Sequence, residues 1–338
     1  MRETVASRVA LGLILAGTAT ILWAAASGGG VGQQNPLPLP PPMSDRKSFT
    51  ISDNVNLVVL DVSVKDAKGG YVTGLSKDAF QIFDDGRPRE ITEFQKVDTP
   101  VTVGLIVDDS GSMVRKRPEV VLAGLAFAKE SNKRDEFFVV NFNNSVVMGL
   151  PPRLKFTDDL QTLRSALYYG RPEGQTALYD AIATGLKHME LSPQQKRVLI
   201  VVSDGGDNVS KTSLAALMQL IESSRATIYT IGLYDRDDND RNPSVLKNFA
   251  KATGGEFFEP PTLDDVIPVF HKISSDIRNR YTMAYVPDMS DKRLLRTIRV
   301  LAQADGRRLN VRTRTLYSIA PSSQLVAQET KHSQERSR

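Results

Sequence analysis

Three oxygen-bearing side chains stand on alternate residues directly after an apolar run. The run Thr102–Val107 has no helical period and predicts a strand buried on both faces. It breaks into Asp108-Asp-Ser110-Gly-Ser112, and loops at the carboxyl ends of such strands are where open α/β sheets place their ligands. One carboxylate and two hydroxyls suit Mg²⁺, which takes oxygen ligands. The alternative is a polar turn, with Ser112 as the N-cap of the next helix.

Two later segments offer further oxygen atoms. Thr176 opens a predicted helix, where its hydroxyl stands in the first turn. A second apolar run, Arg197–Val202, predicts another buried strand, and Asp204-Gly follows it. These residues therefore stand at a helix start and a strand end, the places from which a ligand at the edge of an α/β sheet is reached.

The joint pattern resembles the metal-ion-dependent adhesion site of von Willebrand factor type A domains. Carried over residue by residue, the resemblance implies a site made of Asp108, Ser110, Ser112, Thr176 and Asp204. It implies that the hydroxyls supply neutral oxygens and that the aspartates act mainly through hydrogen bonds and water. The bound Mg²⁺ then keeps much of its charge, and an acidic group of a partner protein completes its shell. Mn²⁺ is the alternative ion, and Ca²⁺ is less favoured.

The surroundings of this motif differ from many adhesion receptors of that family. Those receptors carry acidic residues that form a second, calcium-binding site where this chain has Arg115–Arg117, so no second site is predicted. The basic run is interpreted as a solvated helix start, with attraction of an acidic partner as the alternative. Asp109 is given no role beyond solvent exposure, and Asp207 and Asn208 are interpreted as turn residues. The cluster Asp235–Asp240 lacks the glycine and glutamate of a calcium loop and is predicted to be a solvated loop.

Length and composition limit the function classes. The 338 residues leave room for one domain of about 200 residues and a smaller one. The net charge of +4 is mild and no basic stripe is present, so no nucleic-acid partner is predicted. The absence of cysteine excludes disulfides, thiolate metal sites and lipid attachment through cysteine.

The amino-terminal segment predicts export. Arg2 and Arg8 precede an apolar run that ends in Ala-Ala-Ala-Ser, which is typical of a secretory signal peptide over residues 1–27. An uncleaved membrane anchor is the alternative, since the run is near the minimum length of a bilayer span. The chain is expected in the periplasm, in the cell envelope or outside the cell, and contact with a membrane is expected only through this segment. Residues 28–46 are rich in glycine and proline and predict an extended linker.

The central region, residues 99–280, alternates strands and helices. This order is typical of a parallel sheet with crossover helices and predicts a doubly wound, mainly parallel α/β sheet, similar to a Rossmann fold. The predicted strands are 102–107, 135–142, 145–148, 196–202, 227–231 and 256–258. The predicted helices are 119–131, 160–168, 176–189, 214–224, 242–253 and 263–280.

The flanking regions, residues 47–98 and 281–318, alternate with period two and contain glycine turns. Both predict short antiparallel strands. Because about fifty residues make a thin core, we expect the two regions to pair into one small β domain interrupted by the central region. The polar tail, residues 319–338, is predicted to be disordered.

The flanks add a narrower resemblance. Asp61-Val-Ser-Val with Asp66 and Gly69 before the central region, and Tyr281 to Tyr285 with a following proline after it, look like bacterial proteins described as VWFA-related, which are abundant in acidobacteria. With the flanks, the resemblance covers about residues 47–318. It implies more about architecture than about activity.

These observations predict an exported, metal-dependent binding module that engages an unknown protein ligand through its acidic residue, and not an enzyme. A structural envelope scaffold without a metal-dependent ligand is one alternative. A metal-dependent hydrolase is another, but the sequence has no base beside Ser110 and no Asp-x-Asp at the strand end. In adhesion receptors of the family, ligand binding moves the final helix; such a movement of residues 263–280 is a hypothesis here.

Overall fold

The computed structural model describes residues 57–96, 98–234, 241–290 and 295–318. The predicted signal peptide at 1–27, the linker at 28–46 and the tail at 319–338 lie outside the described residues, as does the cluster Asp235–Asp240. In the described part of the chain, no helix is long and apolar enough to cross a membrane.

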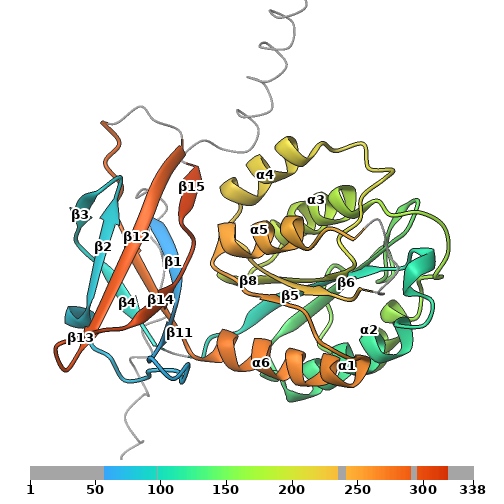
Figure 1. Ribbon diagram of the computed structural model, residues 1–338, viewed down its shortest axis with the longest axis horizontal. Helices are drawn as coiled ribbons and strands as arrows, with labels where there is room; N and C mark the ends of the chain where they lie inside the picture. Colours follow the sequence, from blue (N-terminus) through green and yellow to red (C-terminus); the bar gives the residue numbers. More distant parts are fainter. Residues whose placement is uncertain (1–56, 97, 235–240, 291–294, 319–338) are drawn as a thin grey trace, which may run out of the picture. The chain divides into compact units, whose positions relative to one another are not determined.

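The central sheet has six strands in the order β10-β9-β8-β5-β6-β7 (Figure 1). Its strands are β5 (Val101–Asp108), β6 (Glu136–Phe142), β7 (Val146–Met148), β8 (Lys196–Ser203), β9 (Thr227–Gly232) and β10 (Phe257–Phe258). All neighbours pair in parallel except β7, which is antiparallel to β6. Every residue of β5 is buried, as expected for a strand covered on both faces. The predicted doubly wound, mainly parallel α/β sheet is confirmed.

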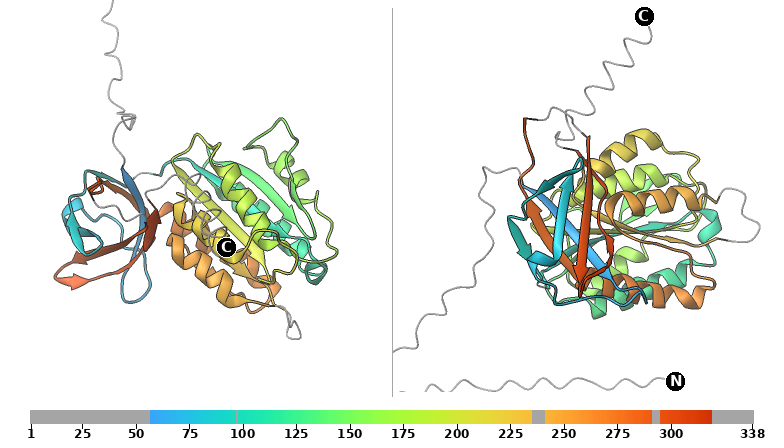
Figure 2. Two further views of the ribbon diagram at one scale, coloured as in Figure 1. Left: turned by 90° about the horizontal axis from the view of Figure 1, so that it is seen from above. Right: turned by 60° about the vertical axis from the view of Figure 1, so that its left-hand side comes forward.

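Helices cover both faces of this sheet (Figure 1 and Figure 2). One face carries α1 (Arg117–Glu130), α2 (Leu160–Leu167) and α6 (Val266–Arg278). The other carries α3 (Leu178–Met189), α4 (Leu214–Ser223) and α5 (Pro243–Thr253). The helices bury residues at helical spacing against the strands, so the main core lies between the sheet and its two helical layers.

Two helix ends differ from the prediction. Helix α3 begins at Leu178, so Thr176 precedes it and does not stand in its first turn. The backbone N–H of Thr176 instead donates to Asn208 Oδ1 in a neighbouring loop. Helix α6 ends at Arg278 rather than at 280, because Arg280 already belongs to strand β11 and pairs with Ser63.

The flanking strands form two antiparallel sheets, β14-β1-β11-β4 and β13-β12-β2-β3, with β15 also paired to β12. The strands are β1 (Val58–Lys65), β2 (Phe80–Asp84), β3 (Arg87–Arg89), β4 (Glu93–Gln95), β11 (Arg280–Tyr285), β12 (Leu295–Ala304), β13 (Arg307–Arg308), β14 (Asn310–Arg312) and β15 (Leu316–Ser318). In both sheets a strand from before the central region pairs with one from after it, since β1 pairs with β11 and β2 pairs with β12. Their apolar side chains form a second core. The exact domain boundaries given above stay predictions.

Strand β3 was missed by the period-two pattern because it has only three residues and none of them is buried. The turn before it was foreseen. Asp85 and Gly86 have φ values of 48° and 79°, and they connect Asp84 to Arg87 in a two-residue hairpin. Two positive φ values in such a loop define a type I′ turn, for which Asp-Gly is favoured.

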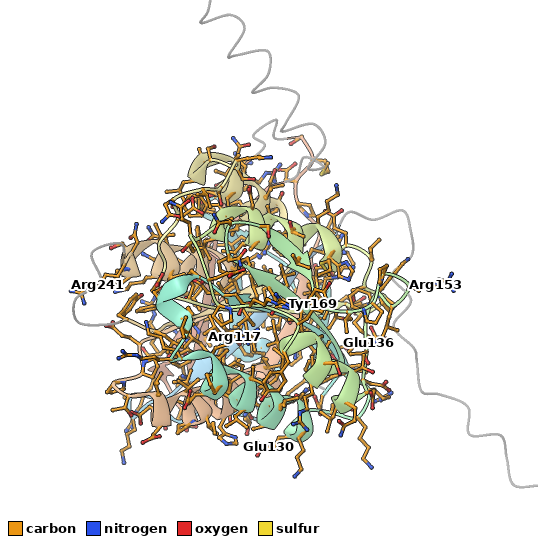
Figure 3. The ribbon with its side chains drawn as sticks, turned by 90° about the vertical axis from the view of Figure 1, so that its right-hand side faces the viewer. Arg117, Glu130, Glu136, Arg153, Tyr169 and Arg241 are labelled. Carbon is orange, nitrogen blue, oxygen red and sulfur yellow. The ribbon has the colours of Figure 1, made fainter. Side chains whose placement is uncertain are left out.

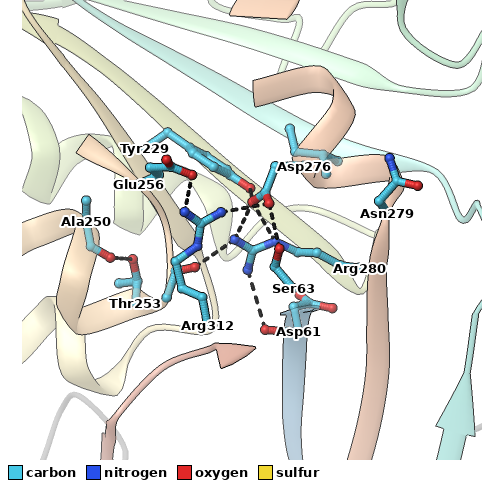
Figure 4. Close-up of polar contacts among 12 residues, drawn as sticks. Asp61, Ser63, Tyr229, Ala250, Thr253, Glu256, Asp276, Asn279, Arg280 and Arg312 are labelled. Carbon is cyan, nitrogen blue, oxygen red and sulfur yellow. Dashed lines mark hydrogen bonds and ion pairs between the residues drawn. The ribbon is translucent and has the colours of Figure 1, made fainter. Parts of the chain in front are cut away.

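A buried group of charges joins α6 to the flanking strands (Figure 4). At its centre Asp276, fully buried in α6, accepts hydrogen bonds from Arg280 Nη2 at 2.7 Å and from Tyr229 Oη at 2.6 Å. On its other oxygen it accepts from Ser63 Oγ at 2.8 Å and forms an ion pair with Arg312 Nη2 at 2.7 Å. These partners come from β11, β9, β1 and β14, so one carboxylate connects four strands.

The same charges extend the connection. Arg280 Nη2 donates to the carbonyl of Gly254, at the end of α5, and Arg312 pairs with Glu256. Gly254 has a φ of 75°, and a Cβ there would lie 2.3 Å from the carbonyl carbon of Thr313. This glycine is therefore required both for the left-handed end of α5 and for the close approach of the chain after β14.

Removal of the Asp276 carboxylate should destabilise the fold strongly. Asp276→Ala leaves the buried guanidinium of Arg280 and the half-buried guanidinium of Arg312 without their shared partner, which typically costs about 3–5 kcal/mol in the free energy of unfolding. Denaturant unfolding monitored by circular dichroism measures this loss. The control is Glu130→Ala, which breaks the exposed Glu130–His271 pair and should cost less than about 1 kcal/mol. Equal losses in the two variants would contradict the assignment.

The same carboxylate predicts a pH dependence. Burial by itself raises the pKa of Asp276, but the charges of Arg280 and Arg312 and the hydrogen bond from Tyr229 outweigh it, so the pKa lies well below its usual range. A lowered folded-state pKa contributes stability that is present above the usual pKa of aspartate and is lost as the pH falls below it. Between pH 5 and pH 2.5, roughly the span of aspartate titration, the wild type should therefore lose more stability than Asp276→Asn. Parallel curves for the two proteins would refute this.

Candidate metal site

Asp108 ends strand β5 and is fully buried. Its Oδ1 accepts a hydrogen bond from the backbone N–H of Ser110 at 2.8 Å, and its Oδ2 accepts from Ser203 Oγ at 2.6 Å. Ser203 is the last residue of the neighbouring strand β8. The carboxylate is thus held between the ends of the two central strands.

Ser110 and Ser112 lie in the tight turn after β5. Their Oγ atoms are 3.1 Å apart, and Ser112 Oγ donates to Asp204 Oδ2 at 2.5 Å. Neither side chain caps a helix, because α1 begins only at Arg117 with Lys116 as its N-cap residue. The interpretation of Ser112 as a helix N-cap is therefore wrong, and its hydroxyl is directed to a carboxylate.

Asp204 follows β8 and is also buried. Its Oδ1 accepts from the backbone N–H of Gly206 at 3.2 Å, while its own carbonyl accepts from Asn242 N. Ser110 therefore contacts Asp108 through its backbone N–H and Ser112 through its hydroxyl, and Ser112 in turn contacts Asp204. Of these four residues only Ser112 is exposed, so the group opens to solvent at that hydroxyl.

Thr176 reaches this group through the backbone of its loop. Gly111 N donates to the carbonyl of Gly174 at 3.0 Å, which ties the loop before α3 to the turn after β5. Asn208 Oδ1 accepts from Thr176 N at 2.9 Å, and Asn208 N donates back to the carbonyl of Thr176. The structure thus brings the Thr176 loop to the other four residues, and Thr176 itself is buried.

Asp207 and Asn208 do more than form a turn. Asp207 Oδ1 accepts from the backbone N–H of Tyr179, in the first turn of α3, and from Ser210 Oγ. With the two bonds between Asn208 and Thr176, this fixes the start of α3 against the loop after β8. Both residues position the candidate ligands without being among them.

The electrostatics of the site suit a cation. The pKa of Asp108 is raised to about 7, mainly by burial and in addition by the nearby charge of Asp204, while hydrogen bonds from Ser110 and Ser203 oppose the shift. The negative charges of the two buried carboxylates therefore repel each other, and a cation beside them would relieve the repulsion.

The donor set also limits which metal fits. In the part of the chain that the structure describes, no three acidic, histidine or cysteine side chains are grouped so that they could hold a metal ion by themselves. The site offers two carboxylates and otherwise hydroxyls, all oxygen atoms, which suits Mg²⁺ or Mn²⁺ and not the metals that prefer nitrogen or sulfur. With only two carboxylates, coordination positions remain for waters or for a ligand from another molecule, and Mg²⁺ usually keeps several such positions.

A buried ion pair behind the site was not foreseen. Asp109 is buried, and Arg117 Nε pairs with its Oδ1 (Figure 3 labels Arg117). Arg117 Nη2 donates to Asn141 Oδ1 at 3.0 Å and to the carbonyl of Leu167. Burial raises the pKa of Asp109, and the charge of Arg117 counteracts the shift.

Two interpretations from the sequence are therefore wrong. Asp109 is not solvent-exposed, and the basic run is not a solvated helix start, since Lys116 and Arg117 are buried and Lys116 Nζ donates to the carbonyl of Leu233. Only Arg115 of the three is exposed. No local pattern marks these contacts, because they depend on how α1 packs against the strand ends.

Comparisons with known proteins agree with this architecture. Residues 103–206 match the family model of the von Willebrand factor type A domain, a range that includes all five predicted site residues. The chain thus contains a domain of this type, with its α/β fold and additional antiparallel sheets. No curated protein matches.

Several solved structures are similar. A von Willebrand factor type A protein from Catenulispora acidiphila has 13% identity over 79% of this chain and 75% of its own, with a TM-score of 0.48. An aerotolerance-related membrane protein from Bacteroides fragilis has 17% identity over 52% and 98%, with a TM-score of 0.42. The von Willebrand factor domain of the pilus tip protein Mfa5 from Porphyromonas gingivalis has 16% identity over 54% and 96%, also with a TM-score of 0.42. Identities this low carry no conclusion about function.

The buried pair behind the site gives a direct stability test. Arg117→Ala leaves the Asp109 carboxylate buried without its cation and should lower the free energy of unfolding by about 3–5 kcal/mol. Arg115→Ala removes an exposed arginine two residues earlier and should change it by less than about 0.5 kcal/mol. Urea denaturation of both variants is the measurement. If Arg117→Ala were as stable as Arg115→Ala, the pair would have no structural role.

Proposed function

We propose that this chain is an exported protein-binding module that holds a divalent cation, Mg²⁺ by preference, at Asp108, Ser110, Ser112, Thr176 and Asp204. An acidic residue of a partner protein completes the shell of the cation. One observation carries the proposal: two buried carboxylates from adjacent strand ends are connected through the serine turn, in which the backbone N–H of Ser110 donates to Asp108 and the hydroxyl of the exposed Ser112 donates to Asp204.

The chemistry of this group favours recognition of an anion. Three of the five side chains are neutral hydroxyls, so a bound divalent cation is not saturated with negative charge. Such an ion attracts one more hard oxygen, and a carboxylate of another protein supplies it. The dependence on a divalent ion is therefore the expected signature of binding.

The site offers little support for hydrolysis. Ser110 Oγ contacts Ser112 Oγ, and the partners of the two described histidines lie elsewhere. His188 contacts the carbonyl of Lys155, and His271 pairs with Glu130. A serine nucleophile would need a base within hydrogen-bond reach.

Export is supported by the sequence alone. The positively charged start, the apolar run and the small residues at its end are the features on which a secretory signal is recognised. We propose a location in the periplasm, at the cell envelope or outside the cell, where a binding module of this kind meets protein ligands.

Calorimetric titration of Mg²⁺ and of Mn²⁺ tests the metal site. The wild type should bind either ion, and saturating metal should raise its melting temperature, since a ligand of the folded state stabilises it. The double variant with Asp108→Ala and Ser110→Ala should lose both effects because it lacks one carboxylate and one hydroxyl of the set.

The control variant removes one negative charge, as the double variant does, but leaves all five candidate ligands in place. Glu173→Ala removes an exposed carboxylate from the loop before α3 and should bind metal like the wild type. Metal binding that survives in the double variant would place the ion elsewhere. Absence of binding in all three proteins would favour a structural scaffold instead.

A further inference from the structure

Strand β7 (Val146–Met148) is the outer edge of the central sheet, and no described strand pairs with its far side. Two hydrogen bonds just before and just after β7 show which of its residues face β6. Asn143 N donates to the carbonyl of Ser145, and Gly149 N donates to the carbonyl of Val139. In an antiparallel pair every second residue points its N–H and C=O groups at the neighbouring strand, so those of Val147, like those of Ser145 and Gly149, face β6. Val146 and Met148 therefore turn their N–H and C=O groups outward.

These outward groups form an open pairing edge. Within the described residues, no backbone hydrogen bond from outside the sheet reaches Val146 or Met148. An edge strand with unpaired N–H and C=O groups is a template on which another extended chain can add. Added strands of this kind gain affinity from main-chain bonds and specificity from pockets for alternate side chains.

Such pockets lie on both sides of β7. A cavity of about 550 Å³ reaches Val147 and continues to Asn141, Tyr168 and Tyr169. A larger cavity of about 1100 Å³ includes Val146 and follows α3. Successive side chains of a strand point to opposite faces of a sheet, so those of an added strand would enter the two cavities in turn.

The smaller cavity has an aromatic rim on a fixed loop. Tyr168 and Tyr169 are 56% and 64% exposed (Figure 3 labels Tyr169), and exposed tyrosines are typical anchors of protein interfaces. The next residue, Gly170, packs directly on Asp109, because a Cβ there would lie 1.6 Å from Asp109 Oδ2. The buried Asp109–Arg117 pair thus holds this rim in place beside the metal loops.

The edge is also close to the candidate metal site. Asp108 is level with Phe142 in β6, and Phe142 is level with Val146 in β7. Two strand spacings separate Asp108 from the start of β7, which is about 10 Å. About three extended residues cover that distance.

We propose that β7 receives an extended segment of the partner protein as an added strand, about three residues away from the acidic residue that binds the cation. This inference rests on the proposed metal-dependent function. It names the form in which the partner binds: an unfolded or edge-strand segment with alternating side chains, apolar or aromatic where they face Tyr168 and Tyr169.

A partner segment fits this edge better than a second copy of the chain. If two copies paired through β7, the side chains next to the edge would be valines and methionine, too small to fill cavities of 550 and 1100 Å³. Continuity with the metal loops also favours a ligand that carries an acidic residue. Exposed Arg171, on the wall of the smaller cavity, adds a positive charge for it.

The test uses random twelve-residue peptides displayed on phage and selected on the full chain in Mg²⁺. Enriched peptides are synthesised and titrated against the wild type, Met148→Pro and Met148→Val. Proline removes one outward N–H and leaves the bonds of Val147 to β6 intact, and the extended Val147 tolerates a following proline. Valine has a similar size and keeps the N–H, so the pair isolates the edge. Unfolding curves check that both variants fold.

The expected result is a set of peptides with an acidic residue whose Mg²⁺-dependent binding weakens at least roughly tenfold in Met148→Pro but not in Met148→Val. N-methylation of alternate peptide amides should weaken binding to a similar extent. Equal affinity for the two variants would overturn the edge site while leaving the metal site in place. An empty selection would overturn it as well, with Mg²⁺ titration deciding the metal site separately.

Two further outcomes distinguish the added strand from the metal-dependent function and a partner segment from a second copy. Peptides that bind equally in EDTA and yet fail to bind Met148→Pro would keep the added strand and overturn the metal-dependent function. A wild-type dimer in sedimentation that Met148→Pro dissociates would identify a second copy as the occupant and overturn the partner segment.

Discussion

The adjacency of β5 and β8 is the constraint on which the site depends. The two strands pair in parallel along seven consecutive residues, so their carboxyl ends come out at the same edge and bring Asp108 and Asp204 into one buried place. That adjacency needs a very small residue in mid-strand. A Cβ at Gly104 would lie 2.3 Å from the ring of Phe138 and 2.5 Å from Leu199, so glycine lets the neighbouring side chains close over β5. The burial of Asp108 and its closeness to Asp204, which together raise its pKa, are thus a consequence of how the core packs.

The sequence predicted this part of the molecule well for physical reasons. Buried parallel strands are continuous apolar runs, and the residues that follow them must lie at the sheet edge, so Asp108 and Asp204 could be placed without coordinates. Segment 145–148 was also predicted as a strand, and its short distance along the chain from the preceding strand fits its antiparallel pairing with β6, whereas the order of the strands in the sheet was not predicted. The sequence did not show which side chains from different elements would face each other in the folded chain. The burial of Asp109 and Arg117 arises only when α1 and the loop after α2 close over the end of β5.

The same limit explains the junction with the flanking sheets. Ser63, Asp276 and Arg312 are far apart in the chain, and nothing around each of them marks it as a partner. They meet only when β1 pairs with both β11 and β14, and β11 begins two residues after α6 ends. Short strands such as β3 were not predicted for a different reason, since three residues without a buried one give no alternation of apolar and polar side chains.

The junction bears on whether the final helix can move. A movement of α6 on ligand binding was a hypothesis from the sequence resemblance, but Asp276 lies near the end of that helix and binds groups from four strands. A slide by one helical turn would break these bonds together and separate the buried charges of Asp276 and Arg280, at a cost of several kcal/mol. A ligand shifts an equilibrium only by its difference in affinity for the two states. The flanking sheets therefore oppose a sliding helix, and a movement of α6 in this chain would have to carry β11 and β1 with it.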